Sequence, residues 1–505
     1  MKNAVTFKTP LIAAILLSAT AAWADVKPTD VWGDWKSQLA GYGYDISAQE
    51  NMSGGDLQIT DLKMNITLPE DEGTVDVALT GVKFHDNGDG TVSVQLPAIM
   101  PIDVHVEAKD ENPVDITVNY TTTGLAMVVS GTPENMTTTY SAASMGMALA
   151  GIVESGNPVE MGDANFTLNN VSGNSSTGGT DIKTRKQDFR AESLFYLIDM
   201  ANPDNAADKV MLKGQLNGLS SNFAAEMPKG VDFQDMAAAL AAGFSVDGTF
   251  AHQGGQAEFA FSGDGDNASG SGSSKSGQFT VQMNSDKLGY AFESTGAQMT
   301  MQVPDLPFPV ELAMAKSGFA MDIPVAQSDE PQDFRLAFTL GDFTISDMIW
   351  GMFDPAGQLP RDPATIAIDL VGKAKVMANI FDPAEMETIG EAAPGELHAL
   401  DVKDLTVRAV GAELTGKGAF TFDNTDMVSF DGMPRPEGVL NLALSGGNAL
   451  LDKLVAMGFI PEDDAMGTRM MIGMFAVPGD GPDSLKSTIE INDQGHVLAN
   501  GQRLK

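Results

Sequence analysis

The segment IDVHVEAKDENPVDITVNY, residues 102–120, decides the fold. Over residues 102–106 every second residue is apolar, and the same alternation returns over residues 114–120, after the turn-forming sequence Asp110-Glu111-Asn112-Pro113. A period of two is typical of a strand with one face turned to a core, because successive side chains point to opposite faces. Two such runs around a short polar segment predict an antiparallel hairpin.

The same pattern recurs along most of the chain. Similar runs cover residues 75–79, 92–96, 166–171, 257–261, 279–283, 334–340, 366–370, 405–410, 440–444 and 487–491. Few helical segments separate them, which favours antiparallel meanders over βαβ units. With 53 Gly and 7% aromatic residues, the composition agrees with many turns. We therefore expect an all-β to β-rich α+β fold, an extended and curved antiparallel sheet with short helices at its ends and edges.

A short amphipathic helix is expected before the first strand. Thr29 can cap it, and Val31, Trp32, Trp35 and Leu39 recur at helical spacing on one face. This pattern predicts a helix that plugs one end of the sheet. The alternative is that Trp32 and Trp35 contact a ligand or a membrane, since tryptophan has both a large apolar surface and a polar N–H.

In the second half a strand is followed by a short helix and then by Phe-x-Pro. The strand 334–340 precedes a helix at 346–350, which contains Trp350, and Phe353-Asp354-Pro355. The strand 440–444 precedes a helix at 448–457, with Gly458 as its stop and Phe459-Ile460-Pro461 after it. Phe381-Asp382-Pro383 ends a third, less regular copy, so the pattern suggests an internal duplication.

A last helix is expected over residues 462–475, where Met466, Met470 and Met474 form a stripe. Such a stripe packs into a core in most proteins, and the alternative is contact with lipid or with a partner. Together with Trp32, Trp35 and Trp350, these methionines are the sequence's candidates for contact with an apolar ligand.

The start of the chain resembles a secretory signal peptide. Lys2 and Lys8 precede the apolar run 11–19 and the small-residue site Ala22-Trp23-Ala24, which predicts cleavage after Ala24. We therefore expect the protein in the periplasm, or secreted. Residues 25–262 are expected to form a β-rich half with an initial helix, 263–278 a Gly/Ser-rich loop or linker, and 279–505 a second β-rich half with short helices. The low-complexity stretch 172–180 is expected to be another solvated loop.

Charge and cysteine content exclude several functions. The net charge of −38 opposes binding to nucleic acid, since phosphate backbones carry the same sign. The absence of cysteine excludes thiolate catalysis, disulfides and cysteine-bound metals. After the first 24 residues no apolar stretch approaches membrane-spanning length, so no transmembrane segment is expected in the mature chain.

No sequence motif for catalysis, a cofactor or a metal stands out. Asp86-Asn87-Gly88-Asp89-Gly90 carries carboxylates as a calcium loop does, but it lacks the EF-hand spacing and is more typical of a tight turn. The five histidines are scattered, without a metal-binding pair. No cofactor and no catalytic residue are therefore predicted, and a hydrolase is the third functional hypothesis.

Several segments of the C-terminal half resemble a family of exported alphaproteobacterial proteins called domain of unknown function 2125. They are residues 328–334, 341–344, 349–355, 359–365, 450–458, 470–478 and 498–504. The resemblance extends over nearly the whole mature chain and is strongest after Pro304, and it implies a Gram-negative envelope. The strand–helix units also look like those of AsmA-like and YdgA-like envelope proteins, a resemblance that implies curved sheets with an apolar concave face able to hold lipid.

The leading functional hypothesis is a non-enzymatic cell-envelope protein that binds or transfers an apolar ligand such as lipid on its curved sheet. An open sheet with alternating Val, Leu, Phe and Met residues would shield them against acyl chains. The alternative is a periplasmic scaffold that binds another envelope protein and no small ligand.

Overall fold

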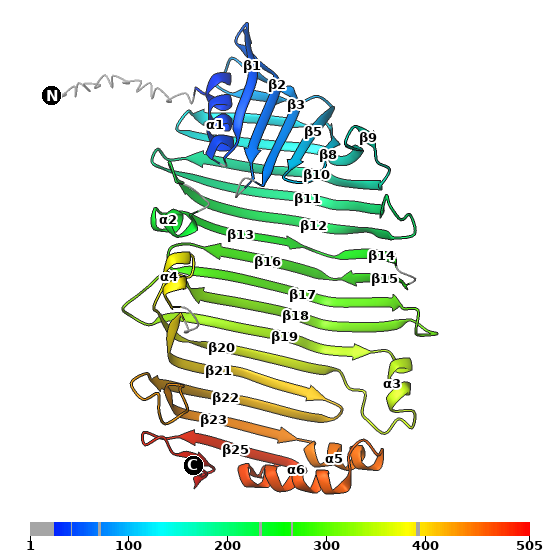
Figure 1. Ribbon diagram of the computed structural model, residues 1–505, viewed down its shortest axis with the longest axis vertical. Helices are drawn as coiled ribbons and strands as arrows, with labels where there is room; N and C mark the ends of the chain where they lie inside the picture. Colours follow the sequence, from blue (N-terminus) through cyan, green and yellow to red (C-terminus); the bar gives the residue numbers. More distant parts are fainter. Residues whose placement is uncertain (1–24, 42, 69–71, 232–234, 264–265, 390–393) are drawn as a thin grey trace, which may run out of the picture.

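A computed structural model describes residues 25–505 except 42, 69–71, 232–234, 264–265 and 390–393 (Figure 1). The expected signal peptide therefore lies outside the described residues. The described residues form six helices, which are α1 (Pro28–Gly41), α2 (Met236–Ala241), α3 (Asp347–Phe353), α4 (Pro383–Ile389), α5 (Gly447–Ala456) and α6 (Glu462–Phe475). None of the described helices has both the length and the apolar content needed to cross a membrane.

The described strands of the first half are β1 (Asp45–Ser53), β2 (Asp56–Thr67), β3 (Gly73–Asp86), β4 (Val92–Gln95), β5 (Ile99–Ala108), β6 (Val114–Thr123), β7 (Ala126–Thr132), β8 (Asn135–Glu154), β9 (Asn157–Pro158), β10 (Gly162–Gly178), β11 (Ile182–Ala201), β12 (Lys209–Pro228), β13 (Ser245–His252) and β14 (Gly255–Gly263). Those of the second half are β15 (Asp266–Ser274), β16 (Ser276–Met283), β17 (Lys287–Gln302), β18 (Val310–Pro324), β19 (Gln332–Ile345), β20 (Ala364–Val376), β21 (Gly395–Ala409), β22 (Ala412–Asp423), β23 (Arg435–Ser445), β24 (Val477–Pro478), β25 (Ser484–Ile491), β26 (Val497–Ala499) and β27 (Gln502–Arg503).

All these strands belong to one antiparallel sheet that extends from β1 to the C-terminal strands (Figure 1). Most strands pair with their neighbours in sequence. At several places two shorter strands pair end to end with one long strand: β13 and β14 share β12, and β15 and β16 share β17. The expected hairpin is present, with β5 and β6 paired from Ile102↔Val118 to Val106↔Val114. The predicted β-rich fold, one extended antiparallel sheet with short helices at its ends and edges, is confirmed.

The helices lie around the sheet and do not form a second layer over its middle (Figure 1). α1 packs against β1, β2 and β3 at the N-terminal end, and α5 and α6 lie together at the other end. Gly458 ends α5 as expected: its φ is +76°, and the amides of Gly458 and Phe459 bond to the carbonyls of Val455 and Leu454, which is a Schellman motif.

Two local expectations about the helices were wrong. α1 begins at Pro28, before Thr29, and the Asp30 carboxylate accepts from the Lys27 amide at 3.0 Å, so Thr29 is not the cap. Phe381-Asp382-Pro383 precedes α4 and does not end a helix.

The two low-complexity stretches are strands and not loops. Residues 172–178 belong to β10, which pairs with β8 and β11. Asp266–Ser274 forms β15 between β14 and β17, so the linker expected over residues 263–278 is mostly strand within the continuous sheet. Glycine and serine have low strand propensity, but pairing on both sides of a strand outweighs it.

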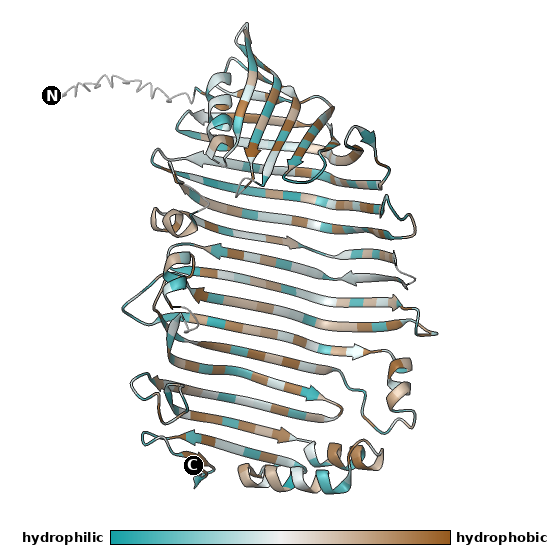
Figure 2. Ribbon diagram, viewed as in Figure 1, coloured by the Kyte–Doolittle hydropathy of each residue, from teal (hydrophilic) through white to brown (hydrophobic). Residues whose placement is uncertain are grey.

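The two faces of the sheet differ in chemistry. Residues directly opposite each other on paired strands share a face, and successive residues alternate between faces. Figure 2 shows the resulting alternation of apolar and polar bands along the long strands. We call the two sides the apolar face and the polar face. On the polar face of β17 to β20, cross-strand ion pairs join Lys287 to Asp322, Lys316 to Glu293, Arg335 to Asp369 and Lys373 to Asp333.

A line of irregular residues crosses the sheet and keeps the apolar side chains on one face. Leu168 and Val171 of β10 are three residues apart, and so are Leu216 and Leu219 of β12, yet all four pack in the same cluster. Between them lie Asn170 (φ +48°) and Gly218 (φ +58°), whose left-handed backbone inserts the extra residue. The alternation changes phase there, and the apolar face continues across the full length of the strands.

The main core lies where α1 covers the apolar face. Trp32 of α1 packs with Leu57 and Ile59 of β2 and with Phe84 of β3, and all four are at most 1% exposed. The Trp32 Nε1–H donates to Glu50 at 2.8 Å, which satisfies its polar atom. The expectation that this helix plugs one end of the sheet is confirmed.

Candidate apolar ligand face

A row of phenylalanines crosses the middle of the apolar face. Each of the pairs Phe250↔Phe279, Phe279↔Phe292, Phe292↔Phe319 and Phe319↔Phe338 is directly opposite in the register. The row therefore spans β13, β16, β17, β18 and β19, and it continues into Ile368 of β20 and Leu405 of β21. All five rings are 37–47% exposed. The phenylalanine row is thus a continuous apolar surface open to solvent.

A second row runs beside the first, two residues along each strand. Its members, in direct register from β16 to β20, are Val281, Tyr290, Met321, Leu336 and Leu370. The Tyr290 ring stacks on Phe279 with 6.3 Å between centroids. Two adjoining rows give an apolar surface several residues wide. Exposed apolar patches of more than a few hundred Å² mark interaction sites in most soluble proteins.

Aromatic rings over glycines flatten the apolar face. Tyr196 lies over Gly214, Phe259 over Gly270 and Phe334 over Gly372, each glycine being the direct partner of the aromatic residue. In each case the ring fills the space that a side chain on the glycine would need. Such rings shield the backbone without standing up from the sheet. These three rings therefore lie close to the backbone of the neighbouring strands.

Small residues of β14 and β15 hollow the apolar face into a pocket of about 330 Å³. Its floor consists of Gly255, Ala257, Gly272, Ser274 and Ala297. Its walls are Tyr196 and Leu216 on one side and Met299, Leu312, Met314 and Phe343 on the other. The low-complexity stretch therefore supplies the floor of a mainly apolar pocket, of a size in the range that ligand sites occupy.

The tryptophans near the N-terminus are packing residues. Trp32 is 1% exposed and so is not accessible to a ligand, which corrects its place among the candidates. Trp35 packs edge-on against Phe84 at 5.3 Å and belongs to the same core.

Trp350 lies in α3, at an edge of the sheet (Figure 1). It is partly buried and packs on Phe353 at 4.9 Å, while Met348, Met352 and Phe353 of the same helix are exposed. Trp350 is thus far along the sheet from the tryptophans of α1, and the structure does not bring the candidates into one site.

The methionine stripe is exposed, so the expectation that it packs into a core is wrong. Met466, Met470 and Met474 of α6 are 57–68% exposed, and Met471 beside them is also exposed. α6 is held instead through Ala465, which is fully buried, and through Arg469, which binds Asn448 and Asp452 of α5. The stripe is therefore free to contact another molecule.

Two of the histidines form ion pairs with aspartates. Lys83 and His85 bond to Asp56 at 2.8 and 2.7 Å and lower the pKa of its carboxyl to about 2. Asp115, at 2.6 Å, raises the pKa of His105. His252 and His398 lie on β13 and β21, and His496 precedes β26. Within the described ranges, no cluster of three or more histidines and carboxylates is placed to hold a metal ion.

The segment 86–90 is a turn between β3 and β4. The Asp86 carboxylate accepts from the Gly88 amide at 2.8 Å, and the Asp89 carboxylate accepts from the Thr91 amide and hydroxyl. The bonds from Thr91 lower the pKa of Asp89. Both carboxylates serve the turn itself, as the sequence predicted.

The phenylalanine row was missed by the sequence reasoning. The strands 279–283 and 334–340 were recognised, and each contains a member of the row. The available signal was the recurrence of Phe in successive strands, but only the register places these residues side by side.

The comparisons with known proteins give one match. Neither a curated protein nor a solved structure matches the chain. A family model, DUF2125, described as an uncharacterized protein conserved in bacteria, matches residues 250–503, so the resemblance is narrower than the expected near-complete extent. The matched half contains every member of the phenylalanine row. The chain therefore belongs to the DUF2125 family.

Proposed function

We propose that this protein binds lipid on the apolar face of its sheet, along the phenylalanine row. The observation that carries the proposal is that five aromatic rings in direct register are left 37–47% exposed. Complete burial of a phenylalanine side chain stabilises a protein by about 1.5–3 kcal/mol, so each ring leaves on the order of 1 kcal/mol unrealised. A hydrocarbon chain lying along the row would realise it.

The chemistry of the surface favours a hydrocarbon over a protein partner. Protein interfaces are only about 56–58% apolar and carry a hydrogen bond every 100–200 Å². In the two rows the Tyr290 hydroxyl is the one polar side-chain group. The backbone N–H and C=O groups are used in the sheet ladders, so an added strand would find no partners on this face.

The sequence start supports an envelope lipid as the ligand. The basic and apolar segments before Ala24 predict export, and the family is a bacterial one. In the envelope, an uncovered apolar face would meet phospholipids and fatty acids. The continuity of the row across five strands gives a ligand a path along the sheet, which is a geometry suited to transfer as well as to binding.

A second function, contact with an envelope partner, is favoured by the exposed stripe of α6. Met466, Met470 and Met474 form an adaptable apolar surface, and methionine is common at surfaces that accommodate different partners. The stripe lies at the end of the sheet opposite α1 (Figure 1). A partner docked there would leave the phenylalanine row free.

The test is native mass spectrometry with organic extraction, on protein purified from its own envelope without detergent. We expect reproducible co-purified phospholipid or fatty acid on the wild-type chain. The double variant Phe292→Ser, Phe319→Ser should lose most of it, because the two rings pair directly at the centre of the row.

The matched control is Ala291→Ser, Ala320→Ser. These residues pair directly on the same two strands but on the polar face. Lipid retained by the control and lost by the phenylalanine variant supports the proposal. A lipid-free wild-type chain, or equal lipid in all three proteins, contradicts it and leaves the partner-binding function.

A further inference from the structure

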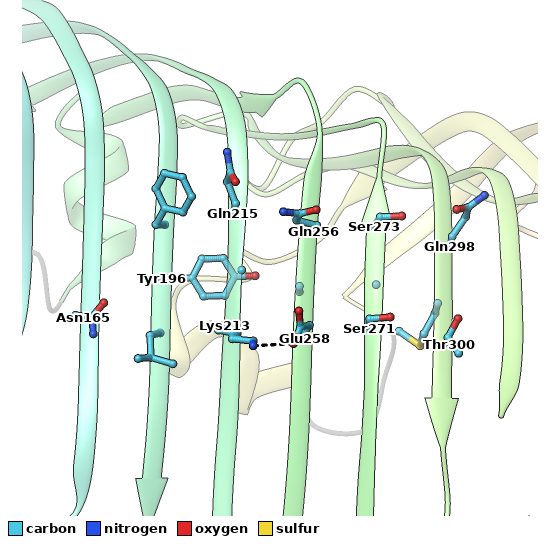
Figure 3. Close-up of a pocket in the computed structure, with 16 residues that line it drawn as sticks. Asn165, Tyr196, Lys213, Gln215, Gln256, Glu258, Ser271, Ser273, Gln298 and Thr300 are labelled. Atoms are coloured by element: carbon cyan, nitrogen blue, oxygen red, sulfur yellow. Dashed lines mark ion pairs between the residues drawn. The ribbon is translucent and has the colours of Figure 1, made fainter. Parts of the chain in front are cut away.

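A second hollow lies on the polar face, behind the apolar pocket. Its volume is about 600 Å³, and it is lined by β10, β11, β12, β14, β15 and β17 (Figure 3). The two hollows lie on either side of the same strands, and their linings share Tyr196, Gln256, Ala257, Gly272, Ser273, Gln298 and Met299. Because Gly and Ser alternate in β15, small residues occur on both of its faces, and the sheet is thinned from both sides.

Two rows of polar side chains line this hollow in direct register. One contains Gln215, Gln256, Ser273 and Gln298, and the other contains Lys213, Glu258, Ser271 and Thr300. Figure 3 shows the two rows side by side across four neighbouring strands. The rows repeat at the spacing of the strands, which is about 4.8 Å.

Most of these polar groups lack a protein partner. Among the described residues, the side chains of Gln256, Ser271, Ser273, Gln298 and Thr300 form no hydrogen bond with the rest of the protein. Amides and hydroxyls both donate and accept, so they can bind a ligand that does the same. Lys213 and Glu258 neutralise each other at 2.8 Å, so the hollow has no uncompensated charge for an ionic ligand.

An aromatic ring lies among the polar residues. Phe195 is the direct partner of Gln215 and shares the polar face with it, and the ring is 45% exposed. A phenylalanine at a water-facing strand position gains little from burial. Its negative π face can instead contact the C–H groups of a polyhydroxylated ring.

We propose that this polar hollow binds an oligosaccharide. A sugar chain has the alternating donors and acceptors that the free amides and hydroxyls match, C–H faces for Phe195 and no net charge. The register extends the same chemistry over four strands, which fits several linked sugar units better than a single one. The site is independent of the proposed lipid function, because its side chains lie on the opposite face.

The experiment is saturation-transfer NMR, with titration for Kd, using maltohexaose, cellohexaose and chitohexaose as probes. We expect at least one of them to bind the wild-type chain. Phe195→Ala should weaken that binding about tenfold, and Gln256→Ala with Gln298→Ala by about twofold to tenfold for each lost hydrogen bond. The control is Gln278→Ala, on the polar face of β16 outside the hollow, and it should leave Kd unchanged.

Circular dichroism of each variant checks that the fold is retained. Co-purified lipid should be the same in the Phe195→Ala protein as in the wild type, so failure here and failure of the lipid proposal are distinguishable. No binding of any probe to the wild-type chain overturns the oligosaccharide proposal. Binding that the Phe195 and glutamine variants do not weaken, or that Gln278→Ala weakens equally, overturns it as well.

Discussion

The N-terminal end and the middle of the apolar face have the same strand pattern but differ in whether a helix covers them. At the N-terminal end, α1 covers the face, and Phe84 is completely buried against Trp32 and Trp35. In the middle, Phe292 and Phe319 occupy equivalent face positions and remain almost half exposed. The same strand pattern therefore produces a core where a helix covers it and an open surface where none does.

This difference separates residues that hold the fold from residues available for binding. The cover in α1 is itself fixed by local signals: Pro28 at the first helical position and Asp30 bonded back to the Lys27 amide. The rings of the phenylalanine row stay 37–47% exposed among the described residues. The strands of this open region pair with neighbours on both sides, so the ladders continue from strand to strand.

The largest expected effect compares the same substitution in the two regions. Phe84→Ala should lower the free energy of unfolding by about 3–5 kcal/mol, because it leaves a cavity in a closed core. Phe319→Ala should lower it by about 1–1.5 kcal/mol, because the ring is already partly solvated. Urea denaturation followed by circular dichroism measures both. Equal losses would remove the distinction between the covered and open regions.

A smaller effect is expected at two glycines of β15 in the open region. A Cβ on Gly270 would collide with the Thr300 carbonyl and with Phe259, so Gly270→Ala should be destabilising by about 1–3 kcal/mol. A Cβ on Gly272 would meet only the Gln298 carbonyl at 3.6 Å, so Gly272→Ala should be neutral or stabilising by up to about 1 kcal/mol. Thermal unfolding of the two variants checks this, and the reverse order would show that the ring of Phe259 does not rest on Gly270.

Filling the apolar pocket sharpens the comparison further. Gly272→Leu places a branched side chain on the pocket floor, where the structure has room for it. We expect an intact fold and a severalfold loss of lipid bound in the pocket, measured by extraction. The same substitution should leave the packing of the core around Trp32 unchanged. If the lipid content is unchanged, the pocket does not hold lipid, and lipid binding is confined to the phenylalanine row.

The smallest effect is a pH dependence at the covered end. Bonds from Lys83 and then His85 lower the pKa of Asp56 from 3.8 to about 2, so its ionised form favours the folded state. This contribution is complete above about pH 4 and is lost as the pH falls toward 2. Asp56→Asn should therefore flatten the rise in melting temperature between pH 2 and 4. A profile identical to that of the wild type would contradict the role of this contact.

The strands were predictable and the open surface was not. Alternation within residues 102–120 or 334–340 is local, so the sequence alone indicates the strand and its two faces. The contact between Phe250 and Phe279, or between Phe319 and Phe338, depends on the register of paired strands, which local pattern does not define.

The local sequence also could not predict which apolar side chains are buried. The stripe at Met466 has the same spacing whether it packs or is exposed, and only the position of α6 at the end of the sheet decides. The Gly/Ser composition of residues 266–274 is typical of a linker. The segment is a strand because β14 and β17 pair with it on both sides, and these partners lie outside the segment itself.

The most direct test is site-specific photo-cross-linking in intact bacteria, with p-benzoylphenylalanine at position 292 or at position 291. These neighbours lie on opposite faces of β17. Mass spectrometry then identifies what each position has captured. Lipid adducts at 292 and none at 291 are the predicted result. Equal adducts at both positions, or protein adducts alone at 292, would contradict the claim that the open apolar face binds lipid.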